Sequence, residues 1–434
     1  MSPRCRCNYA VPSDHNHDRL RKAGATGRRA CSCRRGRRCC DAVQLRNEAW
    51  RSGEPVACAS SWTIQLGTGP KTLLHRCCRI RIYLVTVETL ANGNPAEPRR
   101  VLITGTAGFI GFHLAKVLLA EGFVVHGYDG MSDYYDVNLK RRRHQMLLQN
   151  ANFTATEALL EDADRLWAVA ELFKPEIIVH LAAQAGVRYS LENPRAYIDS
   201  NIVGTFNVME IARRLGVDHL LMASTSSVYG ANEEMPFVET EKADSQLTIY
   251  AATKKANESM GHSYAHLWNL PTTVFRFFTV YGPWGRPDLA LYKFVDAILD
   301  GRPIDIYNHG EMARDFTYVD DLVRGIRLLI DTPPVRPDVP SGIRDGDSLS
   351  PVAPFRIVNI GNSDKVRLLD FIDAIEEEVG IKAVRNYMPM QKGDVPATWA
   401  NASLLAELTG YQPKTNFRDG IRQFVAWYRD YANK

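Results

Sequence analysis

Two residues capable of acid–base chemistry stand four positions apart in the segment YAATK. Tyr250 and Lys254 would lie side by side on one face of a helix. A lysine ammonium close to a phenol favours the phenolate and lowers the tyrosine pKa from its usual value of about 10. We therefore predict that Tyr250 acts as a base near neutral pH. Because this spacing also occurs on many helix surfaces, the pair needs support from other residues.

A glycine-rich segment, GTAGFIG, supplies a candidate cofactor site. Gly105, Gly108 and Gly111 stand between a predicted strand and a predicted helix, where glycines allow a tight turn, admit a pyrophosphate and let helix pack on strand. The helix would start around Phe109 and Ile110, which we include among the cofactor-binding residues. Its unpaired N–H groups would face the phosphates.

An aspartate ends the second predicted strand. Asp129 lies 24 positions after Gly105, where its carboxylate can accept a hydrogen bond from the adenosine ribose 2'-hydroxyl. The same carboxylate would repel a 2'-phosphate, so we predict NAD rather than NADP. An ordinary solvated loop aspartate is the alternative.

Hydroxyl groups close a later strand. The segment STSSVYG, which includes Thr225, brings them to a strand end, and open α/β sheets bind ligands beyond the carboxyl ends of their strands. A nicotinamide, a tyrosine base and a strand-end hydroxyl together predict oxidation of an alcohol by hydride transfer.

The candidate cofactor-binding and catalytic residues would be brought together by a sheet with helices on both faces. From Val101 onward, short apolar runs alternate with helical periods, which indicates a parallel sheet with crossover helices. Beyond the first strand in VLITG, strands are predicted at 123–129, 176–183, 219–225 and 272–278. The predicted fold class is α/β, a doubly wound parallel (Rossmann) sheet with a smaller C-terminal α+β substrate lobe.

The predicted domains follow from this pattern. Residues 99–285 would form mainly the NAD-binding Rossmann domain and residues 286–434 mainly the substrate lobe. A Pro/Gly/Ser/Asp-rich stretch at 331–354 is predicted to be a surface loop insertion. The segments FRIVNIG and LLDFIDAIEEEVG are assigned to the smaller lobe.

Residues 1–98 form a leader unlike the rest of the chain. They hold all nine cysteines and carry 17 Lys and Arg against 7 Asp and Glu, whereas the remainder carries 36 against 42. Their cysteine spacings do not match zinc pairs, so no metal site is predicted. We prefer disorder. The alternative is a start-site artefact, because no methionine occurs between Met1 and Met131.

The body of the chain has no cysteine, which suits a reducing cytoplasm. It has no apolar run approaching the roughly 18 residues of a membrane span. We predict a cytoplasmic location, with no membrane and no nucleic acid as partners of the body.

Several long motifs together resemble one family. GTAGFIG, HLAAQAGVRYS, SNIVGT, STSSVYG, YAATKK and RDFTYVDD resemble the extended short-chain dehydrogenase/reductases, and within them the nucleotide-sugar epimerases, from about Arg99 to the C-terminus. SDYYDVNLKRRR, QAGVRYS, YAATKKANE and FTVYGPWGRPD look most like the UDP-glucuronate 4-epimerases. The resemblance implies bound NAD, a UDP-sugar substrate, interconversion of UDP-glucuronate and UDP-galacturonate through a 4-keto intermediate, and a homodimer formed through helices.

The same resemblance implies roles for individual residues. Tyr250 would take the proton of the sugar 4-hydroxyl, Lys254 would steady the phenolate and the nicotinamide ribose, and Thr225 would hydrogen-bond the 4-oxygen. Further residues are expected near the cofactor or the substrate: Ala182, Ala183 and Asn201 by the cofactor, Arg314 on the UDP phosphates, and Arg188 toward the substrate.

Two positions depart from the family pattern. Gly130 stands where the family usually has Asn, and Leu159 stands where an adenine-contacting Asp is common. Both departures would weaken contacts with the adenosine of the cofactor, but neither position is expected to take part in the reaction.

One arginine follows a strand that ends in a turn, in RFFTVYGPWGRPD. If the substrate is a uronate, its buried C5 carboxylate needs a partner, since an unpaired buried charge is costly. We predict that Arg286, with Thr279, supplies it. The alternative is an arginine that caps a loop carbonyl.

Other functions remain open from the sequence. A dehydratase or a decarboxylase of this family typically carries an acid just before VYG, where this chain has Ser226 and Ser227. A UDP-glucuronate decarboxylase is the more serious alternative, because a 4-keto uronate is a β-keto acid that loses CO2 readily. A neutral UDP-sugar 4-epimerase and a non-catalytic dinucleotide sensor are the others, although sensors commonly lack the Tyr and Lys pair.

Overall fold

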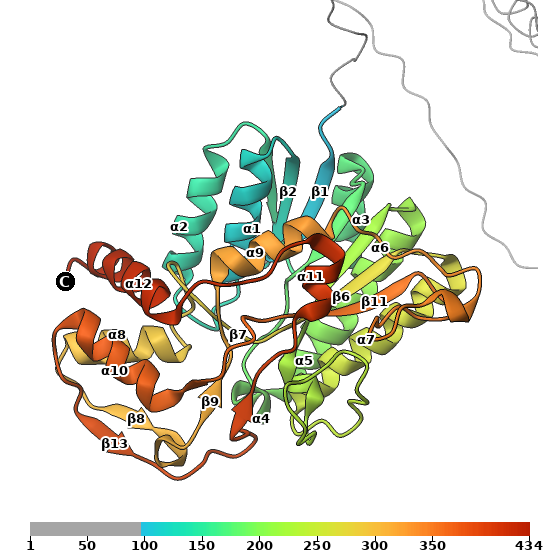
Figure 1. Cartoon of the computed structure of the whole chain (residues 1–434). Helices are drawn as coiled ribbons and strands as arrows, with labels where there is room; N and C mark the ends of the chain where they lie inside the picture. Colours follow the sequence, from blue (N-terminus) through green and yellow to red (C-terminus); the bar gives the residue numbers. More distant parts are fainter. Residues whose placement is uncertain (1–96) are drawn as a thin grey trace, which may run out of the picture. The chain divides into compact units, whose positions relative to one another are not determined.

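The computed structural model describes residues 97–434, so the predictions made for residues 1–96 of the leader lie outside the described part (Figure 1). Seven parallel strands form the central sheet in the order β11-β6-β5-β4-β1-β2-β3. They are β1 (Arg100–Thr104), β2 (Val124–Asp129), β3 (Phe153–Glu157), β4 (Ile177–His180), β5 (His219–Thr225), β6 (Thr272–Phe277) and β11 (Phe355–Ile360). The doubly wound parallel sheet is confirmed, and its strand order reverses between β1 and β4, where such sheets bind ligands.

Helices cover both faces of this sheet (Figure 1). Because successive side chains of a strand point to opposite faces, Val101 and Ile103 join one apolar core, and Leu102 joins the other. One layer contains α1 (Phe109–Ala120), α2 (Val137–Leu148), α9 (Val319–Leu329) and α11 (Ser403–Thr409); the other contains α3 (Ala163–Phe173), α6 (Thr205–Leu215) and α7 (Ile249–Trp268).

The placement of FRIVNIG in the smaller lobe is wrong. This segment forms β11, which pairs in parallel with β6 along its whole length and completes the central sheet. Its apolar residues alternate between the two cores of the sheet, Phe355 joining one and Val358 the other. The apolar residues of this segment predict a strand, but they do not say which sheet the strand joins. The stretch 331–354, predicted as a surface loop, is largely exposed and connects α9 to β11.

The smaller lobe packs around aromatic side chains, among them Phe316 and Phe371, which stack with ring centroids 3.8 Å apart. LLDFIDAIEEEVG lies here as predicted, as α10 (Leu368–Val379). The other elements are α8 (Ala290–Leu299) and α12 (Phe417–Ala432), and the short strands β7 (Thr279–Tyr281), β8 (Ile304–Ile306), β9 (Ala313–Arg314), β10 (Phe316–Tyr318), β12 (Val366–Arg367), β13 (Arg385–Tyr387) and β14 (Ala397–Thr398).

The segment between β4 and α6 is irregular. It contains α4 (Tyr189–Glu192), α5 (Pro194–Tyr197) and a π-helical turn, η1 (Ile198–Gly204), before α6 ends at Gly216 in the left-handed conformation, φ +63°. The short helical turns η2 (Ser226–Tyr229), η3 (Tyr307–Gly310) and η4 (Pro340–Gly342) complete the described elements. None of the helices in residues 97–434 combines the length and apolar character that crossing a membrane requires.

Candidate active site

A cavity of about 1820 Å³ lies at the carboxyl edge of the central sheet and is also lined by residues of the smaller lobe. Every site residue predicted from the sequence lines it, except Asn201. Those residues are Gly105, Gly108, Phe109, Ile110, Gly111, Asp129, Ala182, Ala183, Arg188, Thr225, Tyr250, Lys254, Thr279, Arg286 and Arg314. Segments far apart in the chain therefore meet at one site.

The glycine turn between β1 and α1 has no room for side chains. Gly105 has φ +85°, and a Cβ there would lie 2.8 Å from the backbone nitrogen of Ala182. A Cβ on Gly111 would lie 2.1 Å from the carbonyl oxygen of Gly105. The turn therefore requires glycine at both positions, and it leaves the start of α1 facing the cavity. This cradle fits the pyrophosphate of a dinucleotide.

Asp129 closes the far side of this turn. One carboxylate oxygen accepts from the backbone N–H of Ala107 and the other from that of Met131, both at 2.9 Å. The carboxylate lines the cavity and keeps free lone pairs, so the proposed ribose contact stays a prediction that the geometry permits.

The two departures from the family pattern lie beside this carboxylate. Leu159 is 56% exposed and lines the cavity together with Gly130. A Cβ on Gly130 would lie 2.7 Å from Cδ2 of Leu159. An apolar side chain therefore lines this end of the cavity, and a larger residue at position 130 would require the Leu159 side chain to move.

Asn201 lies behind the cavity wall. It is fully buried in η1, and its side-chain oxygen accepts from the backbone N–H of Gln184 at 2.8 Å. Its amide nitrogen donates to the Gln184 carbonyl and to the Thr253 hydroxyl, both at 3.1 Å. Asn201 therefore holds the loop that follows β4, which carries Ala182 and Ala183. Its own proximity to a cofactor stays a prediction.

Tyr250 stands in the first turn of α7, which is capped by the Thr248 side chain accepting from the N–H of Ala251 at 3.2 Å. Burial raises the pKa of Tyr250, although the nearby Thr225 hydroxyl and the Arg286 charge act in the opposite direction. The expectation of a lowered tyrosine pKa is therefore wrong. The sequence argument weighed the attraction of the lysine and not the loss of water around a buried phenol.

Lys254 is buried one helical turn further along α7. Its ammonium donates to the Ala223 carbonyl of β5 at 3.0 Å, and burial lowers its pKa to about 8. The group is therefore still mostly protonated at neutral pH. The contact anchors the cation beside the end of β5, within the same cavity as Tyr250.

A buried ion pair that we did not predict clamps α7 to the sheet. Arg276 of β6 donates to both carboxylate oxygens of Glu258, at 2.9 and 2.8 Å, and Ser224 of β5 donates to the same carboxylate at 2.6 Å. Both charged side chains are at most 2% exposed. The signal in the sequence was a lone arginine within the apolar run TTVFRFF, because a buried charge needs a partner.

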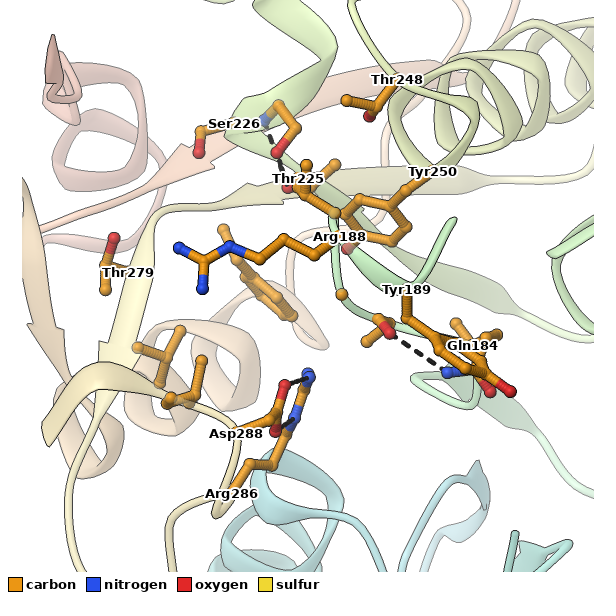
Figure 2. A pocket seen from close by; sticks show the side chains of 18 of the residues that line it. Gln184, Arg188, Tyr189, Thr225, Ser226, Thr248, Tyr250, Thr279, Arg286 and Asp288 are labelled. Atoms are coloured by element: carbon orange, nitrogen blue, oxygen red, sulfur yellow. Dashed lines mark hydrogen bonds and ion pairs between the residues drawn. The ribbon is translucent and has the colours of Figure 1, made fainter. Parts of the chain in front are cut away.

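Thr225 ends β5 next to the tyrosine (Figure 2). Its hydroxyl accepts from the backbone N–H of Ser227 at 3.2 Å and donates to the Ser227 hydroxyl at 3.3 Å. These bonds orient the threonine oxygen at the carboxyl edge of the sheet. Thr225 and Tyr250 thus come together as the sequence predicted.

Arg286 already has a partner within the protein. Its Nε and Nη2 donate to the two carboxylate oxygens of Asp288 at 2.9 and 2.5 Å, and Tyr134 donates to the same carboxylate at 3.3 Å (Figure 2). Burial alone would lower the pKa of Arg286, but the Asp288 charge reverses the direction and raises it. A guanidinium has five N–H donors, so three remain for a ligand. The alternative was an arginine that caps a loop carbonyl. Among the described residues, the Arg286 side chain donates no hydrogen bond to a backbone carbonyl.

The two remaining arginines flank Asp394, which also lines the cavity. Arg314 donates to the carbonyls of Ala313, Val395 and Pro396 at 2.8 to 3.1 Å, and its guanidinium lies 3.7 Å from the Asp394 carboxylate. Arg188 lies 3.6 Å from the same carboxylate and extends into the cavity (Figure 2). The phosphate contact of Arg314 and the substrate contact of Arg188 stay predictions.

Comparison with known proteins agrees with this geometry. The profile of the NAD dependent epimerase/dehydratase family matches residues 101–339. A probable UDP-glucuronate 4-epimerase of Rhizobium meliloti is 57% identical over 329 residues, which are 76% of this chain and 96% of that protein. UDP-glucuronate 4-epimerase 4 of Arabidopsis thaliana is 43% identical, covering 76% of this chain and 75% of that protein.

A solved structure is also similar. It is UDP-glucuronic acid 4-epimerase from Bacillus cereus in complex with UDP-glucuronic acid and NAD, which matches with a TM-score of 0.69 and 29% identity over 76% of this chain and 99% of that one. The glycine cradle, the strand-end threonine, the half-buried tyrosine and the buried lysine occur here within a chain of the same fold and matching sequence. The chain belongs to the NAD dependent epimerase/dehydratase family.

Proposed function

We propose that this chain is an NAD-dependent 4-epimerase that interconverts UDP-glucuronate and UDP-galacturonate. The observation that carries the proposal is that Tyr250, Lys254 and Thr225 line the same cavity as the guanidinium of Arg286. The first three provide acid–base chemistry at an alcohol, and the fourth provides a positive charge for an acidic sugar. Relatives that carry this activity in their names match most of the chain.

NAD, when bound, supplies a reversible hydride acceptor, so that C4 is oxidised to a ketone and reduced again without net redox change. Tyr250 takes the proton of the 4-hydroxyl and returns it after the ring has presented its other face. Thr225 hydrogen-bonds the 4-oxygen and orients it, its hydroxyl proton turning from Ser227 to the sugar. The Lys254 ammonium, held by the Ala223 carbonyl, is proposed to bind the nicotinamide ribose and to steady the phenolate when it forms. Asp129 and the glycine turn hold the dinucleotide.

The C5 carboxylate of the substrate is proposed to bind Arg286 and the Thr279 hydroxyl, which both line the cavity. The three guanidinium donors that Asp288 leaves free can serve an anion, and charge-assisted bonds of this kind are among the strong ones. Arg314 is proposed to contact the diphosphate, and Arg188 is proposed to contact the substrate.

Incubation of the purified protein with UDP-glucuronate is expected to give UDP-galacturonate without an added reductant. Anion-exchange chromatography with NMR of the product would measure this. A product consisting only of UDP-pentose with release of CO2 would show a decarboxylase instead. Bound NAD with no product would favour a sensor, and turnover of UDP-glucose at the same rate would favour a neutral epimerase.

We also propose that the protein is a homodimer. Apolar side chains stand exposed on neighbouring helical elements, Ile198 and Val203 on η1, Phe206 on α6 and Ile249 on α7, each 40 to 46% exposed. A cluster of exposed apolar residues is typical of an interaction surface. A cytoplasmic location is proposed as well, because no cysteine follows Cys78.

Phe206→Glu is expected to shift the protein from dimer to monomer, because a charge would be buried unpaired at the contact. Light scattering coupled to size-exclusion chromatography measures the mass. Val335→Glu is the matched control, since Val335 is 74% exposed in the loop between α9 and β11. A dimer that persists in Phe206→Glu, or a wild-type monomer, contradicts this surface.

A further inference from the structure

Arg143 is a completely buried arginine on α2 that touches both halves of the site. Its Nη1 donates to the Ala107 carbonyl and to the Tyr135 hydroxyl, each at 2.9 Å. Its Nη2 donates to the carbonyls of Trp284 and Gly285 at 2.6 and 3.2 Å. One guanidinium therefore joins the glycine turn of the dinucleotide site to the turn that carries Arg286.

The charge of Arg143 has no ionic partner within the described residues. Its four acceptors are neutral oxygens, and no carboxylate of residues 97–434 forms an ion pair with it. Its Nε is also buried without a hydrogen bond in this part of the chain. A buried unpaired charge is costly, so the chain retains this arginine at a cost to stability. Its neighbours on the helix, Arg141 and Arg142, are exposed.

The two carbonyls that Arg143 holds lie in a strained turn. Trp284 has φ +59°, a conformation that a bulky L-residue adopts only at a cost in free energy. Its ring packs against Phe112 and Trp427, with centroids 5.8 and 5.4 Å away. The Gly285 carbonyl belongs to the peptide bond that leads directly into Arg286. The guanidinium of Arg143 thus fixes the backbone from which the Arg286 side chain extends.

We propose that Arg143 is the positioning residue for the acidic-sugar end of the cavity: it holds the 284–285 turn against the dinucleotide turn and thereby sets where Arg286 meets the substrate carboxylate. This inference rests on the proposed function. It gives a role to the segment SDYYDVNLKRRR, whose Tyr134 binds the partner of Arg286 and whose Tyr135 binds Arg143.

The test compares NAD-loaded wild type with Arg143→Lys. An ammonium is a compact group with three donors and cannot span the Ala107 carbonyl and the two carbonyls of the turn at once. We expect the affinity for UDP-glucuronate to fall at least about tenfold by calorimetry, while the affinity for UDP and the kcat at saturation change by less than about threefold. Arg141→Lys is the matched control on the same helix and should behave as wild type.

A second variant keeps the test decisive if Arg143→Lys fails to fold. Tyr135→Phe removes one acceptor of Arg143 and leaves the arginine in place, so a smaller loss of UDP-glucuronate affinity in the same direction is expected. For either variant, an equal loss of affinity for UDP and UDP-glucuronate would indicate general structural damage and overturn the inference. So would an unchanged preference for UDP-glucuronate over UDP-glucose.

The wild type separates this inference from the proposed function. If the wild-type protein binds UDP-glucuronate no better than UDP-glucose and does not epimerise it, the proposed function fails and the inference fails with it. If the wild type prefers and epimerises UDP-glucuronate while Arg143→Lys keeps the full preference, only the positioning role is overturned.

Discussion

Tyr250→Phe is expected to reduce turnover of UDP-glucuronate by a factor of about 10² to 10⁴, the range typical of a positioned acid–base group. The variant loses the phenol oxygen that takes the proton of the 4-hydroxyl. The ring itself remains and still packs against Tyr197, with centroids 6.0 Å apart. The fold and the bound NAD should therefore persist. Product chromatography measures the rate, and release of NAD from denatured protein measures its content.

A second tyrosine on α7 provides the matched control. Tyr264 donates to Glu210 at 2.8 Å and does not line the cavity, so Tyr264→Phe should keep nearly full activity. Near-normal turnover in Tyr250→Phe would rule out this residue as the base. Loss of NAD in that variant would instead point to a structural role.

Arg286→Leu is expected to lower kcat/KM for UDP-glucuronate about 10² to 10³-fold, because truncating one partner of a buried charge pair costs about 2–5 kcal/mol. Any activity on UDP-glucose should fall far less, since a neutral sugar has no carboxylate to lose its partner. Parallel assays on the two substrates give the ratio directly.

The ion pair with Asp288 complicates that variant, because removing Arg286 leaves a half-buried carboxylate without its partner. The double variant Arg286→Leu/Asp288→Asn removes the stranded charge and should show the same loss of preference. Asp288→Asn alone keeps the guanidinium and should retain the preference for UDP-glucuronate. Equal losses on both substrates in the double variant would argue against carboxylate recognition by Arg286.

The sequence predicted the parts of the site that local spacing encodes. The glycines of the turn, the Tyr and Lys on one helix and Asp129 at a strand end are each set by neighbours in the chain, and all of them line the cavity. Partners far apart in the sequence were not predicted. Arg143 stands in a run of three arginines with no local sign that only one is buried. The contact of Tyr134 with Asp288 spans 154 positions.

For the segment FRIVNIG, predicting a strand and predicting the sheet that it joins were likewise separate problems. The apolar residues of 355–360 indicate a strand, but its pairing with β6 depends on the rest of the fold, because α7 and α11 also pack against β11. The pKa of Tyr250 was misjudged for a related reason. Spacing reveals a neighbouring charge, whereas burial depends on the whole fold.

The late position of β11 in the chain, beside β6 in the sheet, also constrains how the protein folds during its synthesis. Because β11 is the last strand of the central sheet and begins at Phe355, the sheet cannot be completed on the ribosome until the first part of the smaller lobe has emerged. Until then the edge of β6 carries unpaired N–H and C=O groups, which other chains can join. The two lobes are therefore not separable pieces, and a fragment ending at residue 285 would keep this edge open permanently.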